Sequence, residues 1–487
     1  MIKNIKWTAL LGLLLVACNS DDAETVVEVP VTPGTANFSN YVALGDSFAA
    51  GYSDGALFVR GQQGAYVNVL ANQFKAAGGG EFKTPLMNDN LGGLLLDGNV
   101  IAGTRLYFNG QAPVAVSGKP STEVTTKLTG PFNNMGMPGA KSFHLVAPGY
   151  GNLAGVAFGT ANPYFARFAS SATATVIGDA LAQNPTFFTL WIGGNDVLSY
   201  ATSGGLGKDQ TGNLNPATYS SNDITDPTVY ASIYKSLVDN LTANGAKGAV
   251  VNLPYITALP YFTTVPYNPV PLDAATAGQL NAGYAVYNGG LQQMVANKLL
   301  TAEEAAKRTI KFAAGSNAVV LVDEYLTNLL GYGLPSYRQA TKEDLVLLTA
   351  RTFIGRTVGG DPTKVNGLSV PLTDVWVLTK SEIAEVKKAT DAYNTTIESI
   401  ATQKGLALVD SKVVMAQLSS GGVRFGNYVM SSTYVTGGAF SLDGVHPSAR
   451  GYALIANKFV EAINKTYNAT LRTVNLGDYP IQYPANL

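Results

Sequence analysis

The sequence predicts an α/β fold in which helices cover both faces of a mostly parallel sheet. Short apolar runs that end at glycine or at polar residues alternate along the chain with segments of helical periodicity. Runs that are hydrophobic throughout are typical of parallel strands buried on both faces. The chain has 487 residues, 46% of them hydrophobic, which is enough for one elaborated domain.

Four segments have the composition expected of buried parallel strands. They are rich in Val, Leu, Ile and aromatic residues, and turn residues follow them. These segments are 41–44, 186–192, 248–253 and 406–409. Strand followed by helix, repeated along a chain, predicts a parallel sheet with helices on both sides.

Helical patterns separate the predicted strands. Apolar residues recur on one face between Ile233 and Leu241, and again between Ile383 and Ile400, with a glycine after each pattern. We expect the last helix to start at Pro447, because proline is favoured in the first turn of a helix. Apolar residues then continue at helical spacing as far as Ile463.

Two long stretches interrupt this rhythm, and we interpret both as insertions into one domain. The first, at about residues 86–130, contains Asn109-Gly110 between alternating runs, which predicts a hairpin. The second, at about residues 260–378, is expected to hold several helices. One of them would be opened by a capping box from Thr341 to Asp344.

The composition excludes several classes of protein. Lys and Arg number 32 against 33 Asp and Glu, a net charge of −1, so no positive field would attract nucleic acid. One cysteine and two histidines exclude an internal disulfide and argue against a metal centre built on Cys or His. We therefore expect no nucleic-acid partner and no metal centre of this kind.

The N-terminus has the features of a secretory signal. Lys3 and Lys6 precede an apolar run that closes with Leu15-Val16-Ala17-Cys18 and is shorter than the roughly 20 residues that span a bilayer. The four closing residues resemble the lipobox of bacterial lipoproteins, in which the cysteine is acylated and becomes the mature N-terminus. We expect residues 1–17 to be a lipoprotein signal peptide and residues 18–37 a linker.

A lipid on Cys18 predicts a protein anchored in the bacterial cell envelope, at the outer membrane. The acidic segment after Cys18 is similar to surface-export signals, and a plain solvated linker explains it as well. The membrane face that displays the protein therefore stays open. After the linker we expect one domain over residues 38–467 and a C-terminal tail over residues 468–487.

Polar residues follow two predicted strands at the points where these end. Ser47 comes directly after the first strand in Gly45-Asp46-Ser47-Phe48, and Asn195 follows the second strand in Gly193-Gly194-Asn195-Asp196. The carboxyl ends of parallel strands meet at one edge of a sheet, which is where α/β folds bind ligands. A serine hydroxyl exposed there would lie beside an amide that can donate to an oxyanion. Taken alone, Gly-Asp-Ser also fits a helix N-cap or a turn.

A carboxylate and an imidazole lie close together near the C-terminus. Asp443 comes three residues before His446, just ahead of the last predicted helix. That spacing lets Asp443 accept a hydrogen bond from Nδ1–H of the imidazole, which leaves Nε2 to take a proton from a serine. Gly139, between the first two sites, allows a close backbone approach and offers an N–H group to the same place.

Together these four blocks resemble the SGNH or GDSL-type hydrolases. The first block of that family usually reads Gly-Asp-Ser-Leu and matches residues 45–48, with Phe48 in place of leucine. The second-block glycine, the Gly-x-Asn-Asp block and the Asp-x-x-His block match Gly139, residues 193–196 and residues 443–446. The blocks occur in the family's order. The resemblance covers residues 38–467 except for the two insertions.

The resemblance implies a three-layer α/β/α flavodoxin-like fold and hydrolysis of carboxylic esters without a metal or cofactor. Ser47 would be the nucleophile, His446 the general base and then acid, and Asp443 the residue that orients His446. The oxyanion hole would consist of the N–H groups of Ser47 and Gly139 and the side chain of Asn195. These roles match the needs of acyl transfer.

Other polar and apolar residues near the motifs have structural interpretations. Asp46 and Asp196 are expected to support their loops. His144 has no carboxylate three residues before it and is expected to be structural. The apolar patch 91–96 is interpreted as hairpin core rather than as a groove for an acyl chain, and the loop 260–271 should lie near the rim of the site.

Three functions fit these observations. The one we favour is a serine ester hydrolase, a lipolytic esterase that acts on acyl esters through an acyl-enzyme. The second is a carbohydrate O-acetyl esterase that trims polysaccharide and would reject long acyl chains. The third is a binding lipoprotein that kept the fold without catalysis, against which the complete set of motif residues argues.

Overall fold

The structure is a computed structural model that describes residues 30–487, so Cys18 and the predicted signal peptide lie outside the described residues. Residues 31–487 form one unit. Among the helices described, none has both the length and the hydrophobicity that a membrane span needs. Nor do the described residues include a group of three or more His, Cys, Asp or Glu side chains that could hold a metal ion.

Five parallel strands form the central sheet, which confirms the predicted α/β fold class. In chain order they are β1 (Tyr41–Gly45), β6 (Asn134–Gly136), β7 (Phe187–Trp191), β8 (Lys247–Val251) and β17 (Ala407–Val409). Their order across the sheet is β17-β8-β7-β1-β6. Counted along the chain, this is the 2-1-3-4-5 order of flavodoxin-like folds, which places a ligand-binding switch point between β1 and β7.

The strand ends around this switch point are level with one another. Along the whole length of β1, Tyr41 pairs with Phe187 and Gly45 with Trp191 of β7. On its other side, Gly45 pairs with Gly136, the last residue of β6. The loops that leave β1, β6 and β7 therefore start beside one another at the same edge of the sheet.

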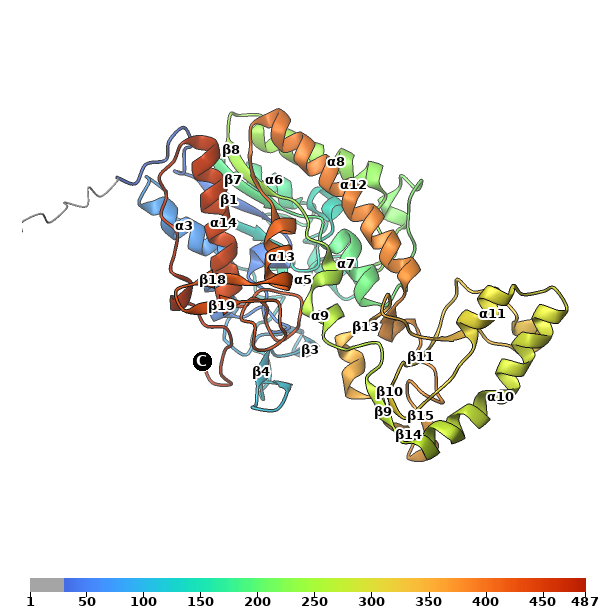
Figure 1. Cartoon of the computed structure of the whole chain (residues 1–487). Coiled ribbons are helices and arrows are strands. Elements are labelled where there is room, and N and C mark those ends of the chain that lie inside the picture. The colour runs from blue at the N-terminus through green and yellow to red at the C-terminus, as the bar shows by residue number, and fades with distance from the viewer. Residues whose placement is uncertain (1–29) are drawn as a thin grey trace, which may run out of the picture. The chain divides into compact units, whose positions relative to one another are not determined.

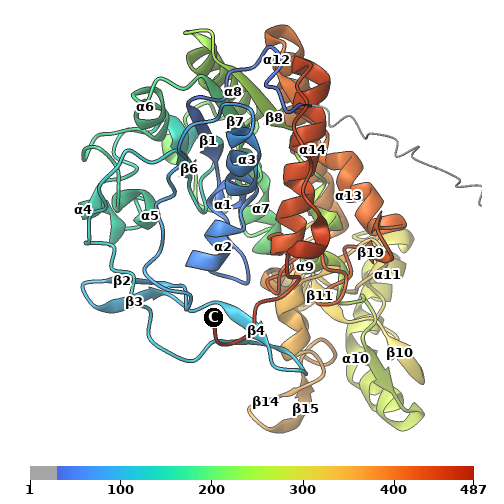
Figure 2. The same ribbon diagram turned by 90° about the vertical axis from the view of Figure 1, so that its left-hand side faces the viewer.

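Four long helices cover the two faces of the sheet, as the three-layer prediction requires (Figures 1 and 2). They are α3 (Tyr66–Lys75), α14 (Ala449–Tyr467), α8 (Pro227–Thr242) and α12 (Lys380–Lys404). Aromatic rings join the helices of each pair. Tyr66 of α3 stacks on Phe459 of α14 at 4.9 Å, and Tyr230 of α8 stacks on Tyr393 of α12 at 4.1 Å.

The last helix begins at Ala449, so the predicted start at Pro447 is wrong by two residues. Ser448 is the N-cap, and its hydroxyl accepts a hydrogen bond from the Gly451 N–H at 3.0 Å. A serine side chain satisfies an amide that has no partner inside the helix, which fixes where the helix starts. Pro447 lies outside it, and its carbonyl accepts a hydrogen bond from Ser53 Oγ at 3.2 Å.

The chain between residues 86 and 130 forms two short hairpins (Figure 2). They are β2 (Leu94–Leu96) with β3 (Asn99–Ala102), and β4 (Leu106–Phe108) with β5 (Pro113–Ala115). The Asn109 side chain closes the second turn by accepting the N–H groups of Gln111 and Ala112. The C-terminal tail reaches this region, since Arg105 Nη2 donates to the carbonyl of Pro484 at 2.6 Å.

Residues 265–378 form what we call the arm, which extends away from the sheet (Figure 1). It contains α10 (Ala274–Ala296), α11 (Ala302–Arg308) and four two-stranded sheets. Its apolar side chains pack into clusters of their own, one of them centred on Leu291, Ile310 and Phe312. The arm therefore carries its own small core.

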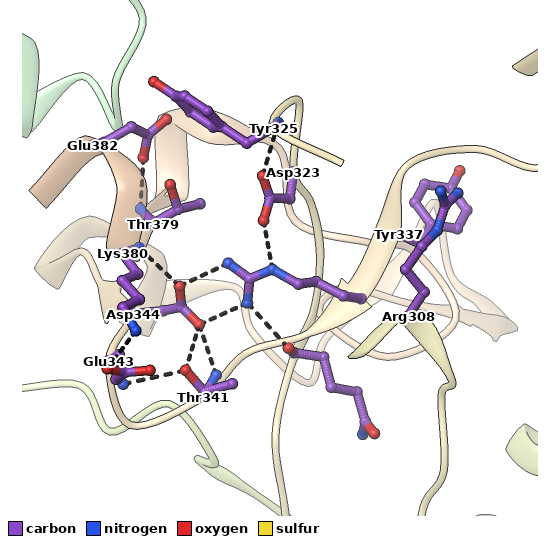
Figure 3. A network of polar contacts seen from close by, with 12 residues as sticks. Arg308, Asp323, Tyr325, Tyr337, Thr341, Glu343, Asp344, Thr379, Lys380 and Glu382 are labelled. Carbon is purple, nitrogen blue, oxygen red and sulfur yellow. Dashed lines mark hydrogen bonds and ion pairs between the residues drawn. The ribbon is translucent and has the colours of Figure 1, made fainter. Parts of the chain in front are cut away.

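No α-helix begins after Thr341 to Asp344, so the predicted capping box is wrong. The segment instead forms β13 (Leu345–Val346) and the 3₁₀ helix η5 (Leu348–Thr352). Asp344 does accept a hydrogen bond from the Thr341 N–H at 2.7 Å (Figure 3), but its two carboxylate oxygens also bind Arg338 at 2.7 and 2.8 Å. A buried charge needs a partner, and this ion pair holds the turn against β12 (Tyr337–Gln339).

Candidate active site

Ser47 is the first residue of α1 (Ser47–Ala50), two residues beyond the end of β1. The Asp46 side chain caps this short helix by accepting the Phe48 N–H at 3.0 Å. The ends of β1 and β7 lie close together, because a Cβ atom at Gly45 would lie 2.6 Å from the Trp191 carbonyl oxygen. Only glycine therefore fits at the end of β1, and the turn presents Ser47 at the edge of the sheet.

Ser47, His446 and Asp443 form one chain of hydrogen bonds. Ser47 Oγ lies 2.8 Å from His446 Nε2, and His446 Nδ1 lies 2.8 Å from Asp443 Oδ2. Because an ionised carboxylate only accepts hydrogen bonds, Nδ1 carries the proton and Nε2 accepts from the serine hydroxyl. The structure thus brings together the three residues that the sequence singled out, in the geometry of a nucleophile, a base and an orienting acid.

Backbone amides hold Asp443 in place. Its Oδ1 accepts the N–H groups of Val445 and His446 at 2.9 and 2.8 Å, and its Oδ2 accepts the Gly55 N–H at 3.0 Å. Burial alone would raise the pKa of Asp443, but the facing His446 and these hydrogen bonds outweigh it and lower the pKa to about 2. Asp443 is therefore ionised at neutral pH and can stabilise an imidazolium.

A second aspartate, which the sequence analysis missed, ties this loop to the segment after α1. Asp54 Oδ1 accepts the Leu442 N–H at 2.9 Å, and Ser441 Oγ accepts the Asp54 N–H at 2.9 Å. Asp54 has a positive φ of 53°, which aspartate tolerates better than most residues. Only the turn signal of Asp54-Gly55 hints at this role in the sequence, because the contact spans 388 residues.

The three predicted oxyanion donors lie at neighbouring strand ends. Ser47 is the first residue of its helix, so its N–H group has no acceptor inside the helix. Gly139 is exposed, and its φ of +79° is one that glycine adopts without strain. Asn195 begins α7 (Asn195–Thr202), and its Nδ2 donates one hydrogen to the Ala140 carbonyl at 3.0 Å. The second amide hydrogen is available for a substrate oxygen.

The two other motif aspartates support loops, as expected. Asp196 accepts the N–H and the hydroxyl of Ser142 at 2.8 and 2.7 Å, which joins the loop after β6 to the start of α7. Burial raises the pKa of Asp196 and raises that of Asp46 to about 7. Neither carboxylate is hydrogen-bonded to His446, so neither belongs to the hydrogen-bonded chain that ends on Ser47.

His144 is structural, as its sequence context predicts. Its Nδ1 accepts the Lys141 N–H at 3.0 Å, and its ring stacks on Tyr150 at 4.5 Å. Burial, with Lys141 close by, lowers the pKa of His144 to about 4. His144 is thus neutral at pH 7, and its Nδ1 already accepts a hydrogen bond from the backbone.

Apolar surface surrounds the candidate triad. The rings of Tyr52 and Phe48 lie 4.7 and 5.5 Å from the His446 ring. A cleft lined almost wholly by apolar atoms includes Phe48 and Val445, the chain neighbours of the predicted nucleophile and base. It extends between α7, α13 (Ser411–Ser420) and α14. Its lining would suit an apolar group better than a polar one.

No family model and no curated protein sequence matches the chain. Three solved structures are similar to it at low scores. An alpha/beta hydrolase from the metagenome of Lake Arreo, Spain, has a TM-score of 0.32 and 12% identity, over 88% of this chain and 96% of that one. A mutant of a Geobacillus acetyl-xylooligosaccharide esterase has a TM-score of 0.31 and 11% identity, over 90% and 99%. An extracellular lipase from Streptomyces rimosus has a TM-score of 0.29 and 12% identity, over 88% and 99%. Scores this low leave the function to be argued from the site itself.

Proposed function

We propose that the protein is a serine ester hydrolase of the SGNH or GDSL type that cleaves carboxylic esters through an acyl-enzyme. One observation carries this proposal. The hydroxyl of Ser47, the imidazole of His446 and the carboxylate of Asp443 are joined by two hydrogen bonds of 2.8 Å at the carboxyl edge of the sheet. Such an arrangement activates a serine for attack on a carbonyl.

In the proposed reaction, Ser47 Oγ attacks the carbonyl carbon of the ester while His446 Nε2 takes the hydroxyl proton. The negative charge that develops on the carbonyl oxygen is stabilised by the N–H groups of Ser47 and Gly139 and by the Asn195 amide. When the tetrahedral intermediate collapses, the alcohol leaves with the proton from His446. A water molecule then attacks the acyl-enzyme with His446 as base, and the carboxylic acid is released.

Asp443 acts through His446 in this scheme. It holds the imidazole so that Nδ1 is protonated and faces away from Ser47, and its negative charge stabilises the imidazolium formed in each step. The oxyanion donors act only once charge has developed, so the loss of one of them should slow turnover by about 100 to 1,000-fold. Asn195→Ala is therefore expected to lower kcat more than it raises KM.

The test is hydrolysis of a p-nitrophenyl ester series, from acetate to palmitate, by the purified protein and by Ser47→Ala. Ser171→Ala, which alters an exposed serine, is the matched control. We expect the control to retain activity and Ser47→Ala to lose it. The preferred chain length then separates a lipolytic esterase from an O-acetyl esterase. Equal activity of the wild type and Ser47→Ala would refute the proposal.

We also propose that Cys18 carries a lipid that anchors the protein in a bacterial envelope, at the outer membrane. Support comes from the lipobox-like residues before the only cysteine of the chain. Cys18→Ser should move the protein from the membrane fraction to the soluble fraction without changing its ester hydrolysis. Unchanged membrane retention of Cys18→Ser would contradict the anchor.

A further inference from the structure

A polar cleft, which we call the rim cleft, lies between the β4–β5 hairpin and the arm. Its walls include Phe108 and Gln111 of the hairpin, Thr263 and Thr264 at the end of α9 (Pro260–Thr263), Arg351 of η5 and Tyr434. It encloses about 650 Å³, within the roughly 300 to 1,000 Å³ of pockets that hold small ligands.

Three walls of the rim cleft are fastened to the loop that carries Asp443 and His446. The hydroxyl of Tyr434 donates to the Leu442 carbonyl at 2.6 Å. The N–H of Tyr261, at the start of α9, donates to the Gly444 carbonyl at 2.9 Å. The hairpin is held by the N–H of Leu106, which donates at 2.7 Å to the carbonyl of the same Asp54 that binds Leu442.

The fourth wall, η5, lies against the same loop. A Cβ atom at Gly444 would be 3.0 Å from a methyl group of Leu348, the first residue of η5, and 3.0 Å from the backbone nitrogen of Tyr261. Gly444 also has a φ of +76°. Glycine adopts this φ without strain, and its lack of a side chain lets α9 and the helix that carries Arg351 lie close to the triad loop.

The proton transfer in the proposed mechanism determines which part of an ester lies toward this cleft. In the proposed mechanism, His446 Nε2 gives its proton to the departing alcohol, so the alcohol portion of the ester must lie over the imidazole. The rim cleft is anchored at residues 442–444, on the Asp443 side of that imidazole. An alcohol portion that extends past His446 toward residues 442–444 would approach the rim cleft, whose walls are anchored there.

The chemistry of the cleft indicates what such an alcohol carries. Its lining offers hydroxyl and amide groups, two aromatic rings and one guanidinium, and no Asp or Glu among the residues described. Arg351 is exposed and forms no ion pair with a carboxylate in the part of the chain that the structure describes. A cation without a carboxylate partner, among groups that bind hydroxyls, favours a hydroxyl-rich ligand with a negative charge.

We propose that the rim cleft binds the alcohol portion of the ester and that Arg351 selects esters whose alcohol portion is hydroxylated and anionic. This inference rests on the proposed ester hydrolysis at Ser47. Two sources of that chemistry are an acylated acidic sugar and an acylated glycerophosphate. They differ in whether the anion is a carboxylate or a phosphate.

The experiment compares pairs of substrates in which one member carries an anionic group and the other is neutral. One pair is an O-acetylated methyl glucuronoside and its uronamide, and the other is acetylated glycerol 3-phosphate and acetylglycerol. The wild type, Arg351→Gln and Arg356→Gln are assayed on each pair and on p-nitrophenyl acetate. Arg356 is the control, because it is an exposed arginine of the arm that does not line the rim cleft.

We expect the wild type to favour the anionic member of at least one pair by about 10-fold in kcat/KM, as one charge-assisted hydrogen bond allows. Arg351→Gln should lose that preference, whereas Arg356→Gln should keep it and should hydrolyse p-nitrophenyl acetate at the wild-type rate. The pair that shows the preference identifies the anion. Equal rates on both members of each pair, or a preference that survives in Arg351→Gln, would overturn the inference. A wild type inactive even on p-nitrophenyl acetate would instead refute the proposed function.

Discussion

The triad at the sheet edge and the Arg338 network in the arm both contain aspartates, but the partners of these aspartates differ. At the sheet edge, the contacts of Asp443 lead through His446 to the hydroxyl of Ser47. In the arm, Arg338 lies between Asp323 at 2.6 Å and Asp344 at 2.7 Å. Asp344 also accepts hydrogen bonds from the N–H and hydroxyl of Thr341 and from the Lys380 N–H (Figure 3).

This difference separates a network suited to chemistry from one that supports the fold. In the arm, both carboxylates face the same fixed guanidinium, and Arg338 with the hydrogen bonds to Asp344 outweighs the effect of burial and lowers the pKa of Asp344. At the sheet edge, the imidazole has one fixed partner and one partner, Ser47, that can give up a proton. We therefore expect changes in the first network to affect stability and changes in the second to affect turnover.

The largest expected effect is on turnover. Asp443→Asn should lower kcat by about 10⁴-fold, because the amide can donate to Nδ1 and so favour the wrong tautomer of His446. The measurement is kcat for a p-nitrophenyl ester, with circular dichroism to establish that the variant is folded. A folded Asp443→Asn protein that retains more than a tenth of the activity would contradict the role assigned to Asp443.

The next effect is on stability. Arg338→Met should lower the free energy of unfolding by about 3 to 5 kcal/mol, because Asp323 and Asp344 are left buried without a counter-charge. Urea denaturation measures this loss, and kcat should stay within about 2-fold under conditions where the variant is folded. Arg356→Met, at an exposed position, is the control. If Arg338→Met is folded but as inactive as Asp443→Asn, the assignment of the Arg338 network to stability alone is contradicted.

The smallest expected effect is a pH dependence of stability that comes from Asp54 beside the triad. Burial raises the pKa of Asp54 to about 7 from its usual 3.8, so the folded state favours the protonated acid. Its contribution to stability is complete below about pH 4 and is lost as the pH rises through 7. Asp54→Asn keeps an oxygen for the Leu442 N–H and does not ionise. Between pH 5 and 8, the free energy of unfolding of this variant should rise by about 1 to 3 kcal/mol relative to that of the wild type, as measured by urea denaturation. If the difference in unfolding free energy between the variant and the wild type is the same at pH 5 and pH 8, Asp54 is ionised throughout this range and the prediction is wrong.

Local patterns predict the parts of the fold that local sequence determines. The continuous apolar runs at residues 41–44 and 186–192 predict β1 and β7 because these strands are buried on both faces. The strand β6 was missed, since Asn134–Gly136 is too short to show a period. At Thr341 a local capping signal is present, but the buried ion pair with Arg338 determines the structure instead.

The same distinction holds at the candidate site. Asp443 and His446 can be predicted as partners because they are three positions apart, and Ser47 and Asn195 because they follow predicted strands. The support given by Asp54 could not be predicted, since it joins Leu442 across 388 residues. The rim cleft could not be predicted either, because its walls come from four separate parts of the chain.

The central claim is that Ser47 becomes covalently acylated, and the most direct test is to trap it. The protein is treated with a fluorophosphonate, which reacts with activated serines, and the modified peptide is identified by mass spectrometry. We predict one adduct, on Ser47, that is absent from Ser47→Ala and formed far more slowly by His446→Ala. A protein that hydrolyses esters without an adduct on Ser47, or that is labelled equally in Ser47→Ala, would contradict the account.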